Sequence, residues 1–207
     1  MNPILSIWTK PKQTIQYVLE TKTWNYGFFI ILVASISIGL TSFADTGFLT
    51  NLPLVLIILL GIISSFVGGI IGWFINAGLY TWVGKWLGGT GKFKEMATVV
   101  PLSSLPIIWM LPYNLLLVAI YGKTLFQDPY EMGSLTNIPI ILFILSNLLL
   151  LGLGVFSTVI LSKAIGVVHH FSTWRGFGTI MIIVGILLII LIPIMIIIFF
   201  SFFLIAI

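Results

Sequence analysis

Five long apolar stretches constrain this chain more than any other feature. They hold a single charged residue, Lys85 at the edge of the second, and cover residues 26–43, 52–87, 99–121, 138–162 and 178–207. A helix needs about 20 apolar residues to cross a hydrocarbon core of about 30 Å. Every stretch except the slightly short first one reaches that length. The sequence therefore predicts an all-α, polytopic membrane protein with five transmembrane helices.

The composition leaves no room for a separate water-soluble domain, because 59% of the 207 residues are hydrophobic and only 7% are charged. We expect residues 1–25 to form a cytoplasmic interfacial segment and residues 26–207 to form one five-helix domain. Cysteine is absent, which excludes disulfides and thiolate chemistry.

The basic residues predict the orientation. Eight of the nine fall on one side of the predicted spans: Lys10, Lys12, Lys22, Lys85, Lys92, Lys94, Lys163 and Arg175. The other side receives Lys123 with Asp45, Asp128 and Glu131. The positive-inside rule then places the N-terminus in the cytoplasm and the C-terminus outside, in a cell membrane. No basic cluster is long enough for nucleic acid, so the expected surroundings are the lipid bilayer and its headgroups.

Residues 11–23 predict a short amphipathic helix. Ile15, Val18 and Leu19 recur at helical spacing, and polar side chains occupy the other face. We expect this helix to lie at the membrane interface. A partner-binding helix is the alternative.

The second stretch carries small residues in two adjacent rows, and the fourth repeats the pattern. The predicted packing positions are Gly61, Ser64, Ser65, Gly68, Gly69, Gly72 and Asn76 in the second, and Gly154 and Thr158 in the fourth. Small side chains let helices approach closely in a membrane, so we expect the second and fourth spans to form the packed centre. The alternative is a groove that admits a lipid or another ligand.

Prolines predict a kink in the third span. Pro101, Pro106 and Pro112 each lack a backbone donor, and we expect Asn114 or a neighbouring hydroxyl to satisfy a freed carbonyl.

The residues provide no catalytic, cofactor or metal site. No Asp, Glu, Arg or His lies inside a span, which argues against an ion-coupled pump. The stretch 88–92 is superficially similar to a phosphate-binding loop, but Trp86 and Phe93 stand where Gly and Ser or Thr are required. His169 and His170 are adjacent and diverge on a helix, so they do not chelate one metal. We therefore predict no enzyme and no cofactor.

Two predicted cytoplasmic loops remain, and we interpret them as a partner-docking surface. The surface comprises aromatic, basic and glycine residues, one serine and one nearby proline: Gly88, Gly89, Gly91, Lys92, Phe93, Lys94, Pro106, His169, His170, Phe171, Ser172, Trp174 and Arg175. Aromatic and Arg side chains are frequent anchors of protein interfaces. The alternative is that these side chains lie at headgroup depth and contact lipid.

These loops, with the Trp-x-x-Pro-x-x-Thr-like start at residues 8–14, resemble the Yip (Ypt-interacting protein) domain family. The resemblance depends on the glycine-rich turn before Phe93, the Ser104-x-Pro106 element and the His169-x-x-Ser172-x-x-Arg175-Gly176 segment. The resemblance covers nearly the whole chain and implies a compact bacterial five-span member that acts as a non-enzymatic membrane scaffold. It also suggests an accessory role beside an ABC-type exporter in toxic-peptide resistance, with another membrane protein or a second copy as partner. A small transporter or lipid-translocating protein is the alternative.

Overall fold

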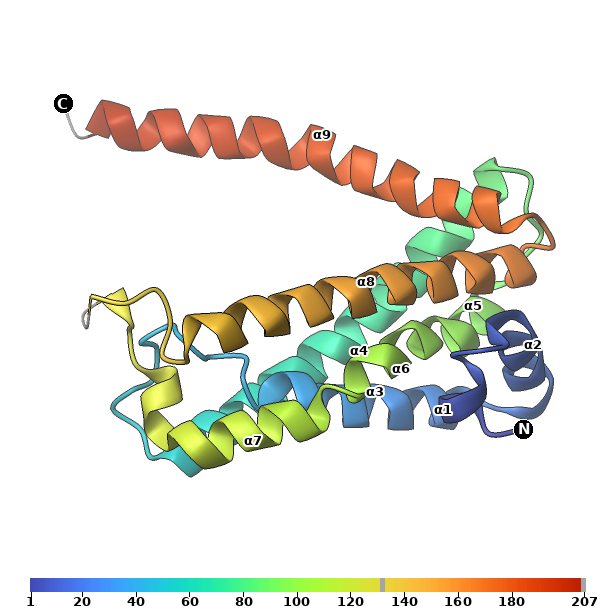
Figure 1. The fold of residues 1–207 in the computed structure, drawn as a ribbon. Coiled ribbons are helices and arrows are strands. Elements are labelled where there is room, and N and C mark those ends of the chain that lie inside the picture. The colour runs from blue at the N-terminus through green and yellow to red at the C-terminus, as the bar shows by residue number, and fades with distance from the viewer. Residues whose placement is uncertain (131–132, 206–207) are drawn as a thin grey trace.

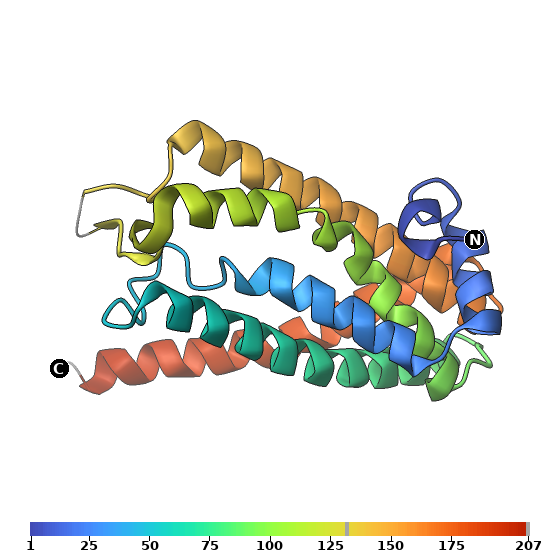
Figure 2. The ribbon, with the colours of Figure 1, turned by 90° about the horizontal axis from the view of Figure 1, so that it is seen from below.

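The computed structural model describes residues 1–130 and 133–205, and all regular secondary structure in this part is helical. Most helices run side by side between two ends of the molecule (Figure 1). The N-terminal end carries α1 (Pro3–Ser6), α2 (Pro11–Thr21) and the loops 87–92 and 169–172. The opposite end carries the connections 40–53, 122–130 and 133–139 (Figure 2).

The helices between these ends differ greatly in length. They are α3 (Trp24–Gly39), α4 (Leu54–Trp86), α5 (Phe93–Val99), η1 (Val100–Ser104), α6 (Leu105–Ile108), α7 (Leu111–Tyr121), α8 (Ile140–Val168) and α9 (Thr173–Ile205), with η2 (Gly122–Phe126) following α7. The second predicted span forms one unbroken helix, α4, of 33 residues.

Three helices, α4, α8 and α9, are long and apolar enough to cross a membrane. A fourth candidate is a pair of segments, Phe93–Ile108 and Leu111–Phe126, bent by 46°. Helix α3 has 16 residues, about 24 Å of helix, which is less than the hydrocarbon thickness. The multi-pass helical class is confirmed, and the number of five spans stays a prediction. Glu131 and the last two residues of the fifth stretch lie outside the described residues.

The bend in the third span confirms the predicted kink, but its polar groups are satisfied differently. Pro101 has no N–H to offer the carbonyl of Ala97, and the indole Nε1 of Trp73 in α4 donates to that oxygen at 2.8 Å. The amide of Asn114 instead donates to the carbonyl of Ser37 in α3, at 2.7 Å. At Pro101 the role predicted for Asn114 or a neighbouring hydroxyl is therefore filled by Trp73.

The packed helix pairs also differ from the prediction. Helix α4 packs along α3, and α8 packs along α9, whereas α4 and α8 barely touch. The prediction that the second and fourth spans together form the packed centre is therefore wrong. The close approaches depend on glycine, because a methyl group at Gly61 would overlap the carbonyl of Gly39, and one at Gly176 would overlap that of Ser162.

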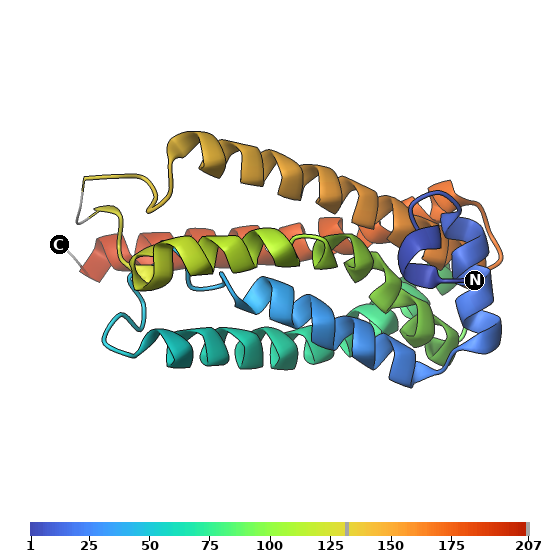
Figure 3. The ribbon, with the colours of Figure 1, turned by 60° about the horizontal axis from the view of Figure 1, so that its bottom comes forward.

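Helix α2 packs against α5 and α8 at the N-terminal end (Figure 3). Ile15 and Val18 are fully buried and, with Ile7, belong to the larger hydrophobic core of the molecule. The apolar face of α2 thus packs on the bundle itself, an arrangement that neither predicted alternative included.

Candidate partner-docking surface

One buried histidine joins the two predicted docking loops. His169 follows the last residue of α8 and is 1% exposed. The backbone N–H of Gly91 donates to its Nδ1 at 3.1 Å, and its Nε2 lies 3.1 Å from the carbonyl oxygen of Tyr80. The imidazole therefore connects the glycine-rich loop, the last turns of α4 and the end of α8.

Three glycines make room for this ring. A methyl group at Gly84 or Gly89 would overlap the imidazole, and one at Gly91 would overlap Val168 and crowd the ring. The side chain of Phe171 stacks on the imidazole with ring centroids 5.3 Å apart. We call His169, Tyr80, Gly84, Gly89 and Gly91 the histidine cluster.

The hydrogen bonds of the histidine cluster define the protonation state. Because Nδ1 accepts a hydrogen bond from an N–H and the Tyr80 carbonyl can only accept, the proton of the neutral ring lies on Nε2. Burial lowers the pKa of His169, and the bond to the Tyr80 carbonyl opposes this in part. Both ring nitrogens are engaged, so this histidine has no nitrogen left for a metal ion.

The turn after α8 presents the neighbouring His170 to solvent. The N–H of Phe171 donates to the carbonyl of Gly166 at 3.0 Å, and that of His170 donates to Val167 at 3.3 Å. This is the Schellman pattern of a helix C-terminus, in which the residue after the cap adopts a left-handed conformation. His170 has φ +57° and occupies the position where glycine is most frequent.

Besides His170, six predicted docking residues have exposed side chains outside this buried framework: Lys92, Phe93, Lys94, Ser172, Trp174 and Arg175. Trp174 is 81% exposed on the first turn of α9. Phe93 is tied to the bundle, since its ring contacts Trp24 and Phe74 at centroid distances of 6.4 Å.

The remaining predicted docking residues are placed unevenly. Gly88 is exposed with φ +83°, Phe171 is half-buried, and Pro106 is buried within α6, away from both loops along the chain. The structure thus brings the two loops together but leaves Pro106 out. Sequence reasoning missed Tyr80 and Gly84. Tyr80 acts through its backbone carbonyl, which every residue type has, and Gly84 is not distinguishable by sequence from the other small residues of the second span.

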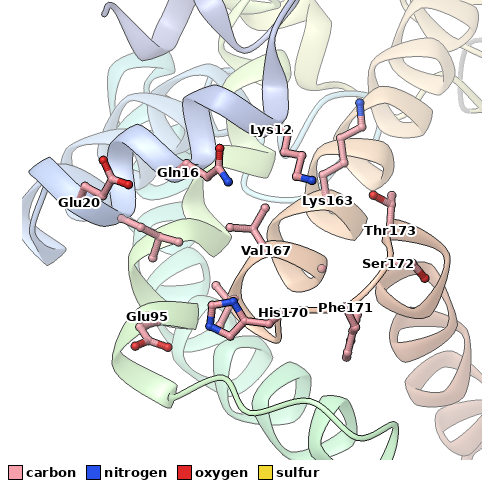
Figure 4. Close-up of a pocket in the computed structure, with 13 residues that line it drawn as sticks. Lys12, Gln16, Glu20, Glu95, Lys163, Val167, His170, Phe171, Ser172 and Thr173 are labelled. Atoms are coloured by element: carbon pink, nitrogen blue, oxygen red, sulfur yellow. The ribbon is translucent and has the colours of Figure 1, made fainter.

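A cavity of about 620 Å³ lies beside these loops, between α2, the end of α8 and the start of α9. Figure 4 shows Lys12 and Gln16 entering it from α2, opposite His170 and Glu95. Lys163 and Glu20 complete the charged lining. Among the described residues no cation lies within 4 Å of a carboxylate oxygen, so both kinds of charge line this cavity without pairing.

The predicted packing positions separate into two sets. Gly61 contacts Gly39, and Gly69 lies close to Ile31 and Ser35, all in α3. By contrast, Gly68 and Gly154 have no atom within 4 Å of where a Cβ would lie. The other positions are half-buried or exposed: Ser64 is exposed, while Ser65, Gly72, Asn76 and Thr158 are half-buried. No described part of this chain therefore packs on Gly68 or Gly154.

The bundle of apolar helices and the loops gathered at one end define a multi-pass helical membrane protein. A model of the Yip1 domain family matches residues 5–196. The chain therefore belongs to the Yip1 domain family, and the resemblance drawn from its loop motifs is confirmed. No curated protein and no solved structure matches the chain.

Proposed function

We propose that this protein is a non-enzymatic membrane scaffold that docks a second membrane protein at its N-terminal end. The observation that carries the proposal is the histidine cluster, which fixes the glycine-rich loop and the α8–α9 turn to each other. A surface that is already ordered loses less conformational entropy when a partner binds.

The exposed residues around the cluster suit a protein partner. Trp and Arg are enriched among residues that dominate interface energies, and Trp174 and Arg175 are adjacent and exposed. The neighbouring cavity offers unpaired charges of both signs to a polar partner segment. We propose a cell membrane location with this end in the cytoplasm, because it carries eight of the nine basic residues. An ABC-type exporter is a candidate partner on the family resemblance alone.

Site-specific photocrosslinking tests the docking proposal. A photoreactive amino acid at Trp174, and separately at Gln16, should give a discrete protein adduct in native membranes. The same residue at Tyr130, 72% exposed at the opposite end, is the matched control. If position 174 forms only lipid adducts, Trp174 belongs to the aromatic belt and the docking proposal fails.

A second candidate function, lipid handling, is favoured by the bent third span and by a cavity beside it. Broken helices that line a cavity at membrane depth are typical of transporter binding sites. Lipid transfer between labelled and unlabelled vesicles, with and without the reconstituted protein, tests this candidate. An unchanged transfer rate would contradict it.

A further inference from the structure

A second cavity, of about 260 Å³, lies between α3, α4 and the bent third span. We call it the α4 groove. Its α4 wall is made by Ser65, Gly69, Gly72, Trp73, Asn76 and Tyr80. These residues extend over about 22 Å of helix, so the α4 groove runs along the direction in which lipid chains lie.

The α4 groove exists because two features hold its walls apart. On α4 the small residues leave space, since the nearest atom to a Cβ at Gly72 would be the Asn76 Nδ2, 4.0 Å away. On the other side the third span continues as the 3-10 helix η1, whose Ser103 and Ser104 line the groove. The bond from Trp73 to the Ala97 carbonyl fixes this bent segment to α4.

The lining carries polar groups that lack partners. In the described part of the chain, the hydroxyls of Ser65, Ser104 and Tyr80 form no hydrogen bond, although Tyr80 is only 9% exposed. An unsatisfied polar group inside a bilayer costs free energy, because lipid tails offer no partner. The hydroxyls therefore favour an occupant that brings hydrogen-bonding oxygens.

The charge of the lining narrows the class of occupant. None of the described residues that line the α4 groove is charged. A phosphate group taken into it would lose its hydration without meeting a cation, which is strongly unfavourable. An apolar chain with hydroxyl or ester oxygens meets no such penalty.

We propose that the α4 groove binds one uncharged glycerolipid of the diacylglycerol class. The free hydroxyl of the lipid bonds to Tyr80 at one end of the groove, and its acyl chains run along Gly72 and Gly69 toward Ser65. The two proposals are tested independently, because this test measures lipid adducts on α4 and the docking test measures protein adducts at position 174.

The experiment uses the full chain in nanodiscs with a photoactivatable diacylglycerol. Crosslinks should fall on peptides of α4 and of residues 100–108. Unlabelled diacylglycerol should reduce the adduct about tenfold, whereas the same amount of phosphatidylglycerol should leave it unchanged. Equal competition by the two lipids would show ordinary boundary lipid only and would overturn the proposal.

Two leucine variants on the same helix provide a matched pair. Gly72→Leu fills the α4 groove and should lower the adduct about tenfold. Gly68→Leu lies one turn away, where a side chain meets open space, and should keep it. Both variants should melt at the same temperature as the parent. Equal adduct yields in the two variants would overturn the proposal.

A variant that preserves shape tests the hydrogen bonds separately. Tyr80→Phe removes the hydroxyl and leaves the Tyr80 carbonyl, and hence its contact with His169, in place. The adduct yield should fall several-fold. Unchanged yield would mean that the groove selects no hydrogen-bonding lipid, and the assignment would be overturned.

Discussion

The two ends of the molecule hold their loops in opposite ways. At the N-terminal end the neutral ring of His169 is buried, and glycines close around it. At the opposite end a carboxylate connects the loops. Asp45 accepts hydrogen bonds from the Thr136 hydroxyl and the Asn137 N–H, both at 2.8 Å. Asp45 is half-buried and has φ +57°, and its own N–H donates to the carbonyl of Leu125 at 2.9 Å.

This difference shows where the fold is anchored. The histidine cluster lies at the larger core, which joins α2 to the ends of α4, α5 and α8. Asp45 lies beside a small cluster of Ile57, Leu117, Leu125 and Phe126. Helix α8 has no buried residue before Ile160, and α9 has none between Val184 and Ser201. Figure 1 shows the C-terminal part of α9 diverging from the other helices. We therefore expect the N-terminal end to open least and the opposite end to depend on surrounding lipid.

The largest expected difference between the ends is their side of the membrane. Because the chain has no cysteine, single cysteines at Lys92, Ser172 and Tyr130, all exposed, report directly. In intact cells an impermeant thiol reagent should label position 130 and spare positions 92 and 172. The reverse pattern would invert the orientation. Gly91 is unsuitable as a probe, because a side chain there would overlap Val168.

The histidine cluster should be the most sensitive point to substitution. Gly84→Ala pushes a methyl group into the imidazole and breaks its two hydrogen bonds, which should cost about 3 kcal/mol of unfolding free energy. Thermal melting in detergent measures the loss. Gly68→Ala, in open space on the same helix, should show none.

A double variant sharpens the test of the cluster. Removing the ring in His169→Ala eliminates the overlap, so adding Gly84→Ala to it should cost much less than in the parent chain. Strictly additive losses would show that the two residues do not meet.

The membrane-spanning helices and the bend could be predicted from the sequence, because the length of the apolar stretches predicts spans and prolines predict a kink. The sequence also predicted that the two loops form one surface, on the strength of their aromatic and basic side chains. What it could not supply was the reason. From sequence alone, a histidine in a loop rich in aromatic and basic residues is interpreted as a binding residue. Only its burial and its hydrogen bonds with backbone groups show that His169 is structural.

The error over the packed centre has a physical cause as well. Small residues at helical spacing indicate a close approach but not which helix approaches. In α4 one row meets α3 at Gly61 and Gly69, while Gly72 lines the α4 groove and Gly68 faces open space. In α8, Ser162 meets Gly176 of α9. Pairing requires the three-dimensional path of the chain, which residue spacing does not contain.

A change of pH should weaken the N-terminal end through His169. Because its folded pKa lies below the unfolded value, the unfolded chain binds the proton more readily as the pH falls below about 6.5. Stability should be flat above that pH and should fall by at most about 1.4 kcal/mol for each unit below it, until the folded pKa is passed. Melting between pH 8 and pH 5 measures this loss.

Two variants assign the pH effect. His170→Gly keeps the left-handed position and should preserve the pH dependence, because that side chain is exposed. His169→Gln offers a donor and an acceptor without a titrating group and should remove most of it. If His170→Gly abolishes the effect instead, the exposed imidazole is responsible and not the cluster.

The smallest expected effect belongs to the opposite end. Asp45→Ala removes the acceptor for Thr136 and Asn137, and because Asp45 is half-buried, water replaces part of the loss, so the cost should be about 1 kcal/mol. That loss should appear locally, as amide hydrogen exchange at Asn137 about fivefold faster, while the Gly91 amide bonded to His169 exchanges at the parental rate. Asn tolerates the left-handed backbone and keeps one acceptor oxygen, so the exchange rate at Asn137 in Asp45→Asn should lie between those of the parent and of Asp45→Ala. Equal acceleration at Asn137 and Gly91 would show that the ends open as one unit, and the contrast between a rigid N-terminal end and a weaker opposite end would not hold.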